Sequence, residues 1–315
     1  MSVIVGCSLF NGILLAADSR GTIQCLGCPD VYVDNVQKLF TITFDTAIGF
    51  VGDFEAASIL LQSLKSIGRH RRDPISLSRW MPRLFRYQFS KLKPRKDGCP
   101  RDVAFVVASL IRGRPNRIHR ASVRDVLRHI VEGRSAVKRN WVPSILLDIL
   151  SAEPQEAPYV MLQQYPQNLL YRLQSPRFQL QLQNTPDIIA IGSGGCIVEK
   201  NIFPIHDMIL AIDTGDEALW LREAMLRFVQ SEPNLGVGGL FPILKLTEGQ
   251  IEGISHQVAP IGHTDQDVIQ LICQNGRWTQ QNLSTGKRME LKPPWELFPL
   301  RNTRNLLFDD LKDQY

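Results

Sequence analysis

The chain has 315 residues, 44% of them hydrophobic and 21% charged, a composition typical of a globular protein with one large core and room for an appendage. The apolar stretch at residues 2–10 lacks a basic region before it, and the longest later apolar run, at residues 103–111, is far shorter than the roughly 18 residues that a membrane helix needs. We therefore expect a cytoplasmic protein with neither a secretion signal nor a membrane span.

The six cysteines predict free thiols, because the cytosol keeps thiols reduced. Cys25 and Cys28 form one CxxC pair, but a structural zinc site normally needs four ligands and no second spacing of that kind occurs. Loop packing is favoured over a metal role for this pair. We expect no metal and no cofactor.

The positive charge is concentrated in one part of the chain. Residues 65–140 hold 21 Lys and Arg against five Asp and Glu, which leaves the remainder net acidic. The favoured interpretation is a solvated surface or a contact with an acidic partner, such as the acidic part of a neighbouring copy. Nucleic acid is less favoured, because few aromatic side chains accompany the basic ones and no nucleic-acid motif occurs.

The first fifty residues predict an antiparallel meander. Residues 3–9 and 13–17 are almost wholly apolar, as strands buried on both faces are, and an Asn-Gly turn dipeptide lies between them. A loop at residues 21–36 separates this hairpin from a second strand pair over residues 38–52.

Two helices and another buried strand follow. Asp53 is placed to cap a helix over residues 54–67, and a second amphipathic helix spans residues 76–92. The strand at residues 103–111 then leads into an arginine-rich insertion at residues 112–163.

The β pattern resumes with a hairpin near residue 167 and a buried strand that runs into a Gly-Ser-Gly-Gly turn. A helix over residues 217–230 precedes the last core strands, and residues 255–315 carry hairpin signals of their own. We expect an α+β fold with helices outside two antiparallel sheets, in a domain over residues 2–254 that the insertion interrupts. Residues 255–315 form a C-terminal extension.

Five short motifs resemble, in the same order, those of the proteasome β-type and HslV-like branch of the N-terminal-nucleophile (Ntn) hydrolases. They are SVIVG, LLAADSR, KLF, GFVGD and IGSGG. The resemblance covers about residues 2–110 and 168–254. It implies a four-layer αββα sandwich, with the insertion and the C-terminal extension outside the family pattern.

The same resemblance implies a nucleophile at Ser2. Removal of Met1 would make Ser2 N-terminal, so that its own α-amino group could take the hydroxyl proton. Such an amine has a pKa of about 8, and a neighbouring cation lowers this pKa. The family's catalytic Asp matches Asp18, and its Lys, which pairs with that Asp and tunes the amine, matches Lys38.

Further positions take their roles from the family's motifs. The Gly49 N–H matches the donor that stabilises the oxyanion, and Ser193 matches the serine that hydrogen-bonds the terminal amine. Gly21, Ala47 and Val51 match substrate-binding positions, and the apolar side chains of the last two imply an apolar preference before the cut bond.

Two positions depart from the family pattern. Asn234 stands where the family has a catalytic-site Asp, and Val237 stands where it has a Ser. Asn keeps an acceptor oxygen without the charge, and Val cannot form a hydrogen bond. Ser2 also lacks the methyl group by which the family's Thr restricts its side-chain torsion. We therefore expect slow peptidase activity.

Three functions remain open at this point. The first is a peptidase that cleaves peptides or unfolded proteins inside a homo-oligomeric ring. The second is a noncatalytic ring or scaffold subunit, in which Asp18 and Lys38 persist as a structural pair. The third is an Ntn amidohydrolase that acts on a small amide.

Overall fold

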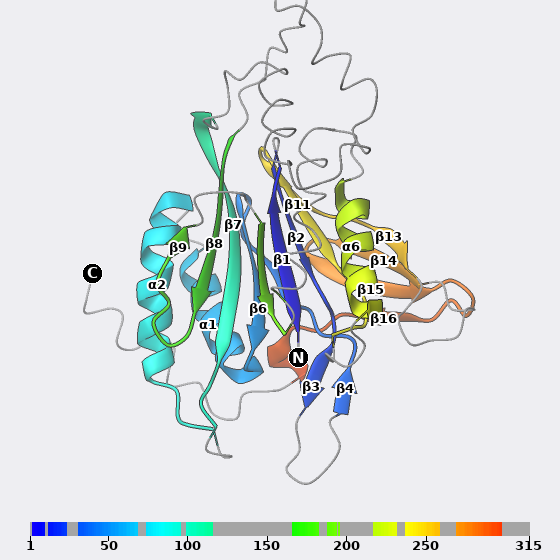
Figure 1. Ribbon diagram of the computed structural model, residues 1–315, viewed down its shortest axis with the longest axis horizontal. Coiled ribbons are helices and arrows are strands. Elements are labelled where there is room, and N and C mark those ends of the chain that lie inside the picture. Colours follow the sequence, from blue (N-terminus) through cyan, green and yellow to red (C-terminus); the bar gives the residue numbers. More distant parts are fainter. Residues whose placement is uncertain are drawn as a thin grey trace, which may run out of the picture.

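The structure is a computed structural model, shown in Figure 1. It describes residues 2–9, 12–23, 31–68, 74–95, 99–115, 166–182, 188–193, 195, 217–231, 237–258 and 269–297. Most of the insertion lies outside the described residues, as do Cys25, Cys28, Asn234 and the last 18 residues of the extension.

A five-stranded antiparallel sheet, in the order β10-β1-β2-β11-β12, carries the N-terminal hairpin at its centre. Every residue of β1 (Val3–Ser8) and β2 (Gly12–Ala17) is buried, as expected for apolar strands covered on both faces. The sheet is completed by β10 (Ile188–Gly192), β11 (Ile243–Thr247) and β12 (Gln250–Gly253).

A second five-stranded antiparallel sheet has its strands in the order β5-β6-β7-β8-β9. It consists of β5 (Leu39–Thr43), β6 (Thr46–Gly52), β7 (Val103–Pro115), β8 (Pro166–Gln174) and β9 (Gln181–Leu182). The two sheets enclose one apolar cluster, to which β1, β2 and β11 contribute from one side and β5 to β8 from the other.

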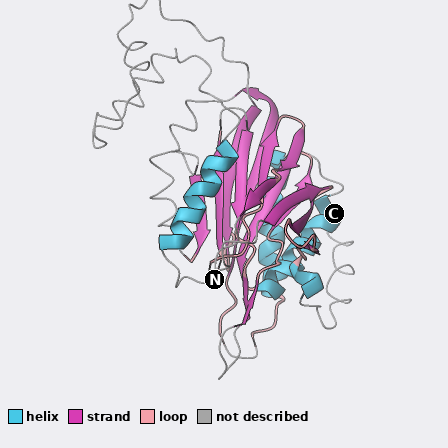
Figure 2. Ribbon diagram, turned by 90° about the vertical axis from the view of Figure 1, so that its right-hand side faces the viewer, coloured by secondary structure: helices cyan, strands magenta, loops and turns pink. Residues whose placement is uncertain are grey.

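Helices pack on the outer faces of both sheets, as Figure 2 shows. Two of them, α1 (Phe54–Gly68) and α2 (Pro74–Ser90), share an apolar cluster with the second sheet. On the other side α6 (Glu217–Ser231) shares a cluster with the first sheet. The predicted cap is confirmed, because Asp53 Oδ1 accepts a hydrogen bond from the Ala56 N–H at 2.9 Å.

The predicted loop at residues 21–36 is partly wrong, because it contains a small two-stranded sheet. Here β3 (Gly21–Ile23) pairs with β4 (Val31–Val33), and both strands lie near the N-terminus in Figure 1. Strands of three residues are too short to show an alternating pattern, so the sequence carries no signal for them.

The described part of the C-terminal extension forms its own four-stranded antiparallel sheet and one short helix. The strands are β13 (His256–Val258), β14 (Ile269–Gln274), β15 (Arg277–Asn282) and β16 (Arg288–Glu290), and the helix is α7 (Pro294–Leu297). No helix in the described part of the chain is long and apolar enough to span a membrane.

This extension sheet is packed into the main core. Leu271, Trp278 and Leu291 are fully buried and belong to the cluster that lies between the two large sheets. The described extension is therefore expected to unfold together with the rest of the protein.

Trp278→Ala tests this coupling. Loss of a large buried aromatic side chain is expected to lower the free energy of unfolding by about 3–5 kcal/mol. The control is Met289→Ala, because Met289 lies in the same extension with 42% of its surface exposed and its loss should change stability by less than about 0.5 kcal/mol. Urea unfolding followed by far-UV circular dichroism gives both values. A Trp278→Ala protein whose main transition is unchanged would contradict the coupling.

Candidate active site

Strand pairing brings Ser2 and Asp18 together. In the β1–β2 ladder Ile4 lies opposite Ala17, so the residues at the two strand ends are neighbours. The Val3 N–H donates to Asp18 Oδ1 at 2.9 Å, and the Asp18 N–H donates to the Val3 carbonyl at 3.2 Å. These two bonds fix the carboxylate beside the first strand.

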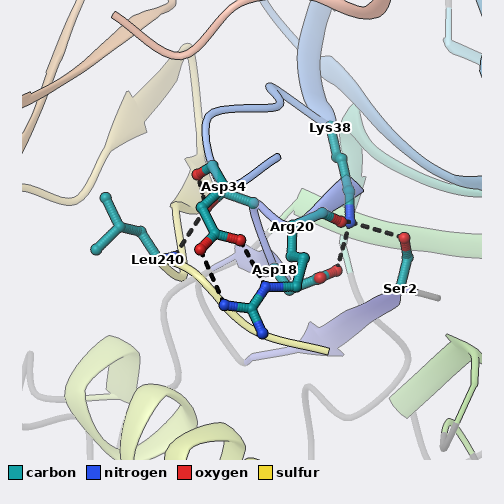
Figure 3. A network of polar contacts seen from close by, with 7 residues as sticks. Ser2, Asp18, Arg20, Asp34, Lys38 and Leu240 are labelled. Carbon is teal, nitrogen blue, oxygen red and sulfur yellow. Dashed lines mark hydrogen bonds and ion pairs between the residues drawn. The ribbon is translucent and has the colours of Figure 1, made fainter. Parts of the chain in front are cut away.

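The amine of Lys38 joins the two side chains, as Figure 3 shows. Lys38 Nζ donates to Ser2 Oγ at 2.7 Å, to Asp18 Oδ1 at 2.7 Å and to the Arg20 carbonyl at 2.5 Å. The three acceptors match the three N–H bonds of an ammonium group. Because Ser2 Oγ accepts from Lys38, its own O–H remains available as a donor.

The three side chains are almost completely buried. The side chains of Asp18 and Lys38 are fully buried, and Ser2 is only 8% exposed. Burial raises the pKa of the Asp18 carboxyl and lowers the pKa of the Lys38 amine, and the attraction between the two charges opposes both shifts. In such surroundings a charge acts on its neighbours much more strongly than it does in water.

A second ion pair, between Arg20 and Asp34, fixes the residue whose carbonyl accepts from Lys38. Arg20, whose carbonyl accepts from Lys38, holds Asp34 through Nε at 2.5 Å and through Nη2 at 2.9 Å. Ser19 Oγ donates to the Asp34 carbonyl at 2.7 Å and accepts from the Leu240 N–H at 2.8 Å. The contacts of Arg20, Asp34 and Leu240 are drawn in Figure 3. Neither the partner of Arg20 nor the link to Leu240 is visible in the motifs.

A main-chain hydrogen bond joins Ser193 to Ser2. Its N–H donates to the Ser2 carbonyl at 2.9 Å, and in the β1–β10 ladder Gly192 lies opposite Val3. Gly192 has φ +100°, and a Cβ there would collide with the Ser2 carbonyl oxygen. Glycine is therefore required for β10 to approach Ser2 this closely.

The glycine predicted to stabilise the oxyanion lies deeper in the sandwich than Ser2. A Cβ at Gly49 would lie 3.0 Å from Ile4, which is two residues further into β1 on the same face as Ser2. The Phe50 N–H donates to the Lys38 carbonyl at 3.3 Å, so the alternation of the ladder turns the Gly49 N–H towards β7.

The same motif contains a second glycine, Gly52, to which the family's motifs assign no role. It ends β6 at the site's end of the sheet, is exposed, and has φ +99°. Its N–H lies two residues beyond that of Phe50 and therefore points to the side of Lys38. The GFVGD motif contains both glycines, and only the strand register distinguishes them.

The three predicted substrate-binding residues are spread along the site. Ala47 is fully buried between the sheets, below Gly49, whereas Val51 is 7% exposed and lies nearer the end of β6. Gly21 lies at the start of β3, where a Cβ would be 2.9 Å from Val36 and 3.0 Å from Phe54. Val51 is thus nearer than Ala47 to the end of β6, and Gly21 directly follows Arg20, whose carbonyl accepts from Lys38.

Val237 is part of the apolar packing. It is 4% exposed and belongs to the cluster that joins α6 to the first sheet, together with Val3 and Val5. The buried methyl groups of Val237 thus stand at the position that the motif comparison assigns to a serine hydroxyl. Among the residues that the structure describes, no group of three or more His, Cys, Asp and Glu side chains is placed to hold a metal ion.

Comparison with solved structures identifies the fold. A chain of the Anbu complex from Pseudomonas aeruginosa, solved as a helical assembly, superposes with a TM-score of 0.50 and 15% identity over 83% of this chain and 88% of that chain. HslV from Trypanosoma brucei gives a TM-score of 0.43 and 13% identity over 78% of this chain and 99% of that chain. No protein-family model and no curated protein sequence matches the chain. The chain thus has the same fold as the Anbu subunit, with most of both chains included.

The buried ion pair makes a prediction about stability. Lys38→Met leaves the Asp18 carboxylate without its cation and is expected to lower the free energy of unfolding by about 3–5 kcal/mol. The double variant Asp18→Asn/Lys38→Met removes both charges and should be more stable than Lys38→Met alone, because no uncompensated charge stays buried. Urea unfolding at neutral pH measures both.

An exposed ion pair provides the control. Arg277 and Glu290 are 3.4 Å apart with 78% and 45% of their side chains exposed, so Arg277→Met should change stability by only about 0–1 kcal/mol. Equal losses in Lys38→Met and in the double variant would show that the charges are not coupled.

Proposed function

We propose that the protein is a proteasome-like peptidase of the Ntn-hydrolase class, which uses Ser2 as its nucleophile after removal of Met1. The observation that carries the proposal is the 2.7 Å hydrogen bond from Lys38 Nζ to Ser2 Oγ, made while the same amine is bound to Asp18. The motif resemblance and the fold shared with the Anbu subunit support it. We assign the two sheets and their outer helices to the four-layer αββα class.

In the proposed reaction the α-amino group of Ser2 takes the hydroxyl proton as Oγ attacks the carbonyl carbon of the substrate. The same amine then gives the proton to the leaving nitrogen as the C–N bond breaks, which leaves an ester on Ser2. Water attacks this ester with the amine again as base, so that the acid is released and Ser2 is restored. No cofactor takes part in these steps.

Lys38 and Asp18 act on this cycle through charge. An ammonium group beside the α-amino group lowers the pKa of that amine, so that more of it is neutral and able to act as base. Asp18 holds Lys38 in place and supplies the opposite charge that its burial requires.

The oxyanion requires an N–H donor near Ser2. Of the two glycines in β6, Gly49 is the position that the motif predicts, and Gly52 is the one whose register and strand-end position suit the role better. We therefore place the donor at Gly52.

Ser193 and Asn234 complete the proposed catalytic set. Gly21, Ala47 and Val51 are the proposed substrate-binding residues.

A noncatalytic subunit is the second candidate. Val237 favours it, because an apolar side chain fills the position at which the family pattern has a hydroxyl. In either case we propose a homo-oligomer, on the basis of the assembly formed by the Anbu subunit. An acidic partner for residues 65–140, in preference to nucleic acid, and a cytoplasmic location also remain proposals.

A substrate panel separates the candidates. Fluorogenic peptides with apolar, acidic or basic residues before the cut bond, together with small amides, are incubated with the wild-type protein and with Ser2→Ala. We expect slow cleavage of the apolar peptides, at least 100-fold reduced in Ser2→Ala because the nucleophile is gone. Ser2→Thr is the matched control and should retain activity. Turnover of small amides alone would indicate an amidohydrolase, and no turnover would favour the scaffold.

The pH dependence tests the role of the terminal amine. Only the neutral amine accepts a proton, so the rate of acylation should rise with pH and level off above the pKa of that amine. The cation of Lys38 should bring the midpoint below the value of about 8 that is usual for an α-amino group. The rate of Ser2 acylation by a β-lactone, measured by quenching the reaction at successive times at several pH values, gives this profile. A rate that falls as pH rises from 6 to 9 would contradict an amine base.

A further inference from the structure

The segment that presents Lys38 belongs to neither large sheet. β4 ends at Val33 and β5 begins at Leu39, so Lys38 lies in a connection between strands. Among the residues that the structure describes, only the Val36 N–H, which donates to the Ser19 carbonyl at 2.9 Å, links residues 35–37 by a main-chain bond to the rest of the active site.

The other main-chain bonds of this segment go to the C-terminal extension. The Gln37 N–H donates to the Lys292 carbonyl at 2.8 Å, and the Lys292 N–H donates to the Asn35 carbonyl at 2.8 Å. Val36 and Lys292 thereby form a parallel bridge. The chain immediately before Lys38 is thus held from one side by the extension.

Side chains of Gln37, which precedes Lys38, and of Phe40, which follows it, also contact the extension. Gln37 Nε2 donates to the Leu39 carbonyl at 2.9 Å and to the Gly276 carbonyl at 3.2 Å, which lies in the turn between β14 and β15. The rings of Phe40 and Trp295 lie 5.2 Å apart, and Lys65 Nζ lies 4.7 Å from the Trp295 ring centre. Aromatic and cation–π contacts of this kind stabilise the docked position of α7.

The extension side of these contacts is itself fixed in the core. Leu291, the residue before Lys292, is fully buried, and its N–H donates to the carbonyl of the fully buried Trp278 at 2.8 Å. A cavity of about 350 Å³ lies beside these contacts and is lined both by the extension and by the β5–α1 surface around Gln37, Phe40 and Lys65.

We propose that residues 291–295 of the extension are a positioning element for Lys38, which connects this short segment to the catalytic site. Lys292 holds the main chain before the lysine, and Trp295 holds Phe40 after it. This inference rests on the proposed function, since it concerns how the amine is kept beside Ser2. The five motifs of the sequence end before the extension, so none of them reports this arrangement.

Trp295→Ala is the test variant, Trp295→Phe the conservative one, and Met289→Ala the control on the surface of the same extension. The rate of Ser2 acylation by a β-lactone is measured against pH. Trp295→Ala should react at least 10-fold more slowly at neutral pH, with its profile moved to higher pH, because a displaced ammonium no longer lowers the pKa of the terminal amine. Trp295→Phe should recover most of the rate, and Met289→Ala should match the wild type.

Three results would overturn the proposal. The first is a Trp295→Ala protein with the wild-type rate and profile, and the second is a slower rate with an unchanged midpoint, which indicates general loosening. The third is a faster rate in Trp295→Ala, which would show that the extension obstructs the site.

A readout without catalysis separates this proposal from the proposed function. If the wild-type protein does not react with the β-lactone, the proposed function fails, and the positioning is measured by NMR titration of the Lys38 side chain with hydrogen exchange of the Gln37 N–H. Trp295→Ala should then shift the Lys38 titration and speed the Gln37 exchange at least 10-fold, whereas Met289→Ala should change neither. Unchanged values in Trp295→Ala would reject the positioning element.

Discussion

The structure of the site depends on one buried amine. Lys38 satisfies the charge of Asp18, touches the oxygen of Ser2 and binds the Arg20 carbonyl, and all of this occurs away from water. A buried charge is costly unless an opposite charge and hydrogen bonds compensate it, so the positions of the strands that supply these partners are closely constrained. The strand pairing around Ser2 supplies the Val3 N–H to Asp18 Oδ1, and the Arg20 carbonyl gives Lys38 its third acceptor, whereas Asp18 Oδ2 has no hydrogen-bond partner among the described residues.

Much of the fold could be predicted from the sequence because its central elements are long and regular. The apolar runs of β1 and β2 have the composition of doubly covered strands, and α1 and α6 show helical periodicity with a recognisable cap on α1. The meeting of Ser2, Asp18 and Lys38 could also be predicted, because each belongs to a motif of a known family and the motifs occur in the same order.

The remaining features depend on geometry that a single sequence does not encode. Gly49 and Gly52 occur in one motif, and only the ladder register tells which N–H points to the β5 side of β6, where Lys38 lies, and which to the β7 side. Asp34 has no motif to mark it as the partner of Arg20. The bond from Gln37 to Lys292 joins main-chain atoms of residues far apart in the chain, so neither side chain carries a signal for it. Long-range main-chain contacts of this kind become visible only in the folded structure.

The central claim is that Ser2 acts with its own α-amino group, and the intact mass of the protein before and after treatment with an α′,β′-epoxyketone tests it most directly. Such a reagent forms a stable ring only with a residue that offers both a hydroxyl and a free amine. We expect loss of Met1 and one adduct that maps to Ser2 and is absent from Ser2→Ala. A retained Met1, or a processed Ser2 that stays unmodified, would contradict it.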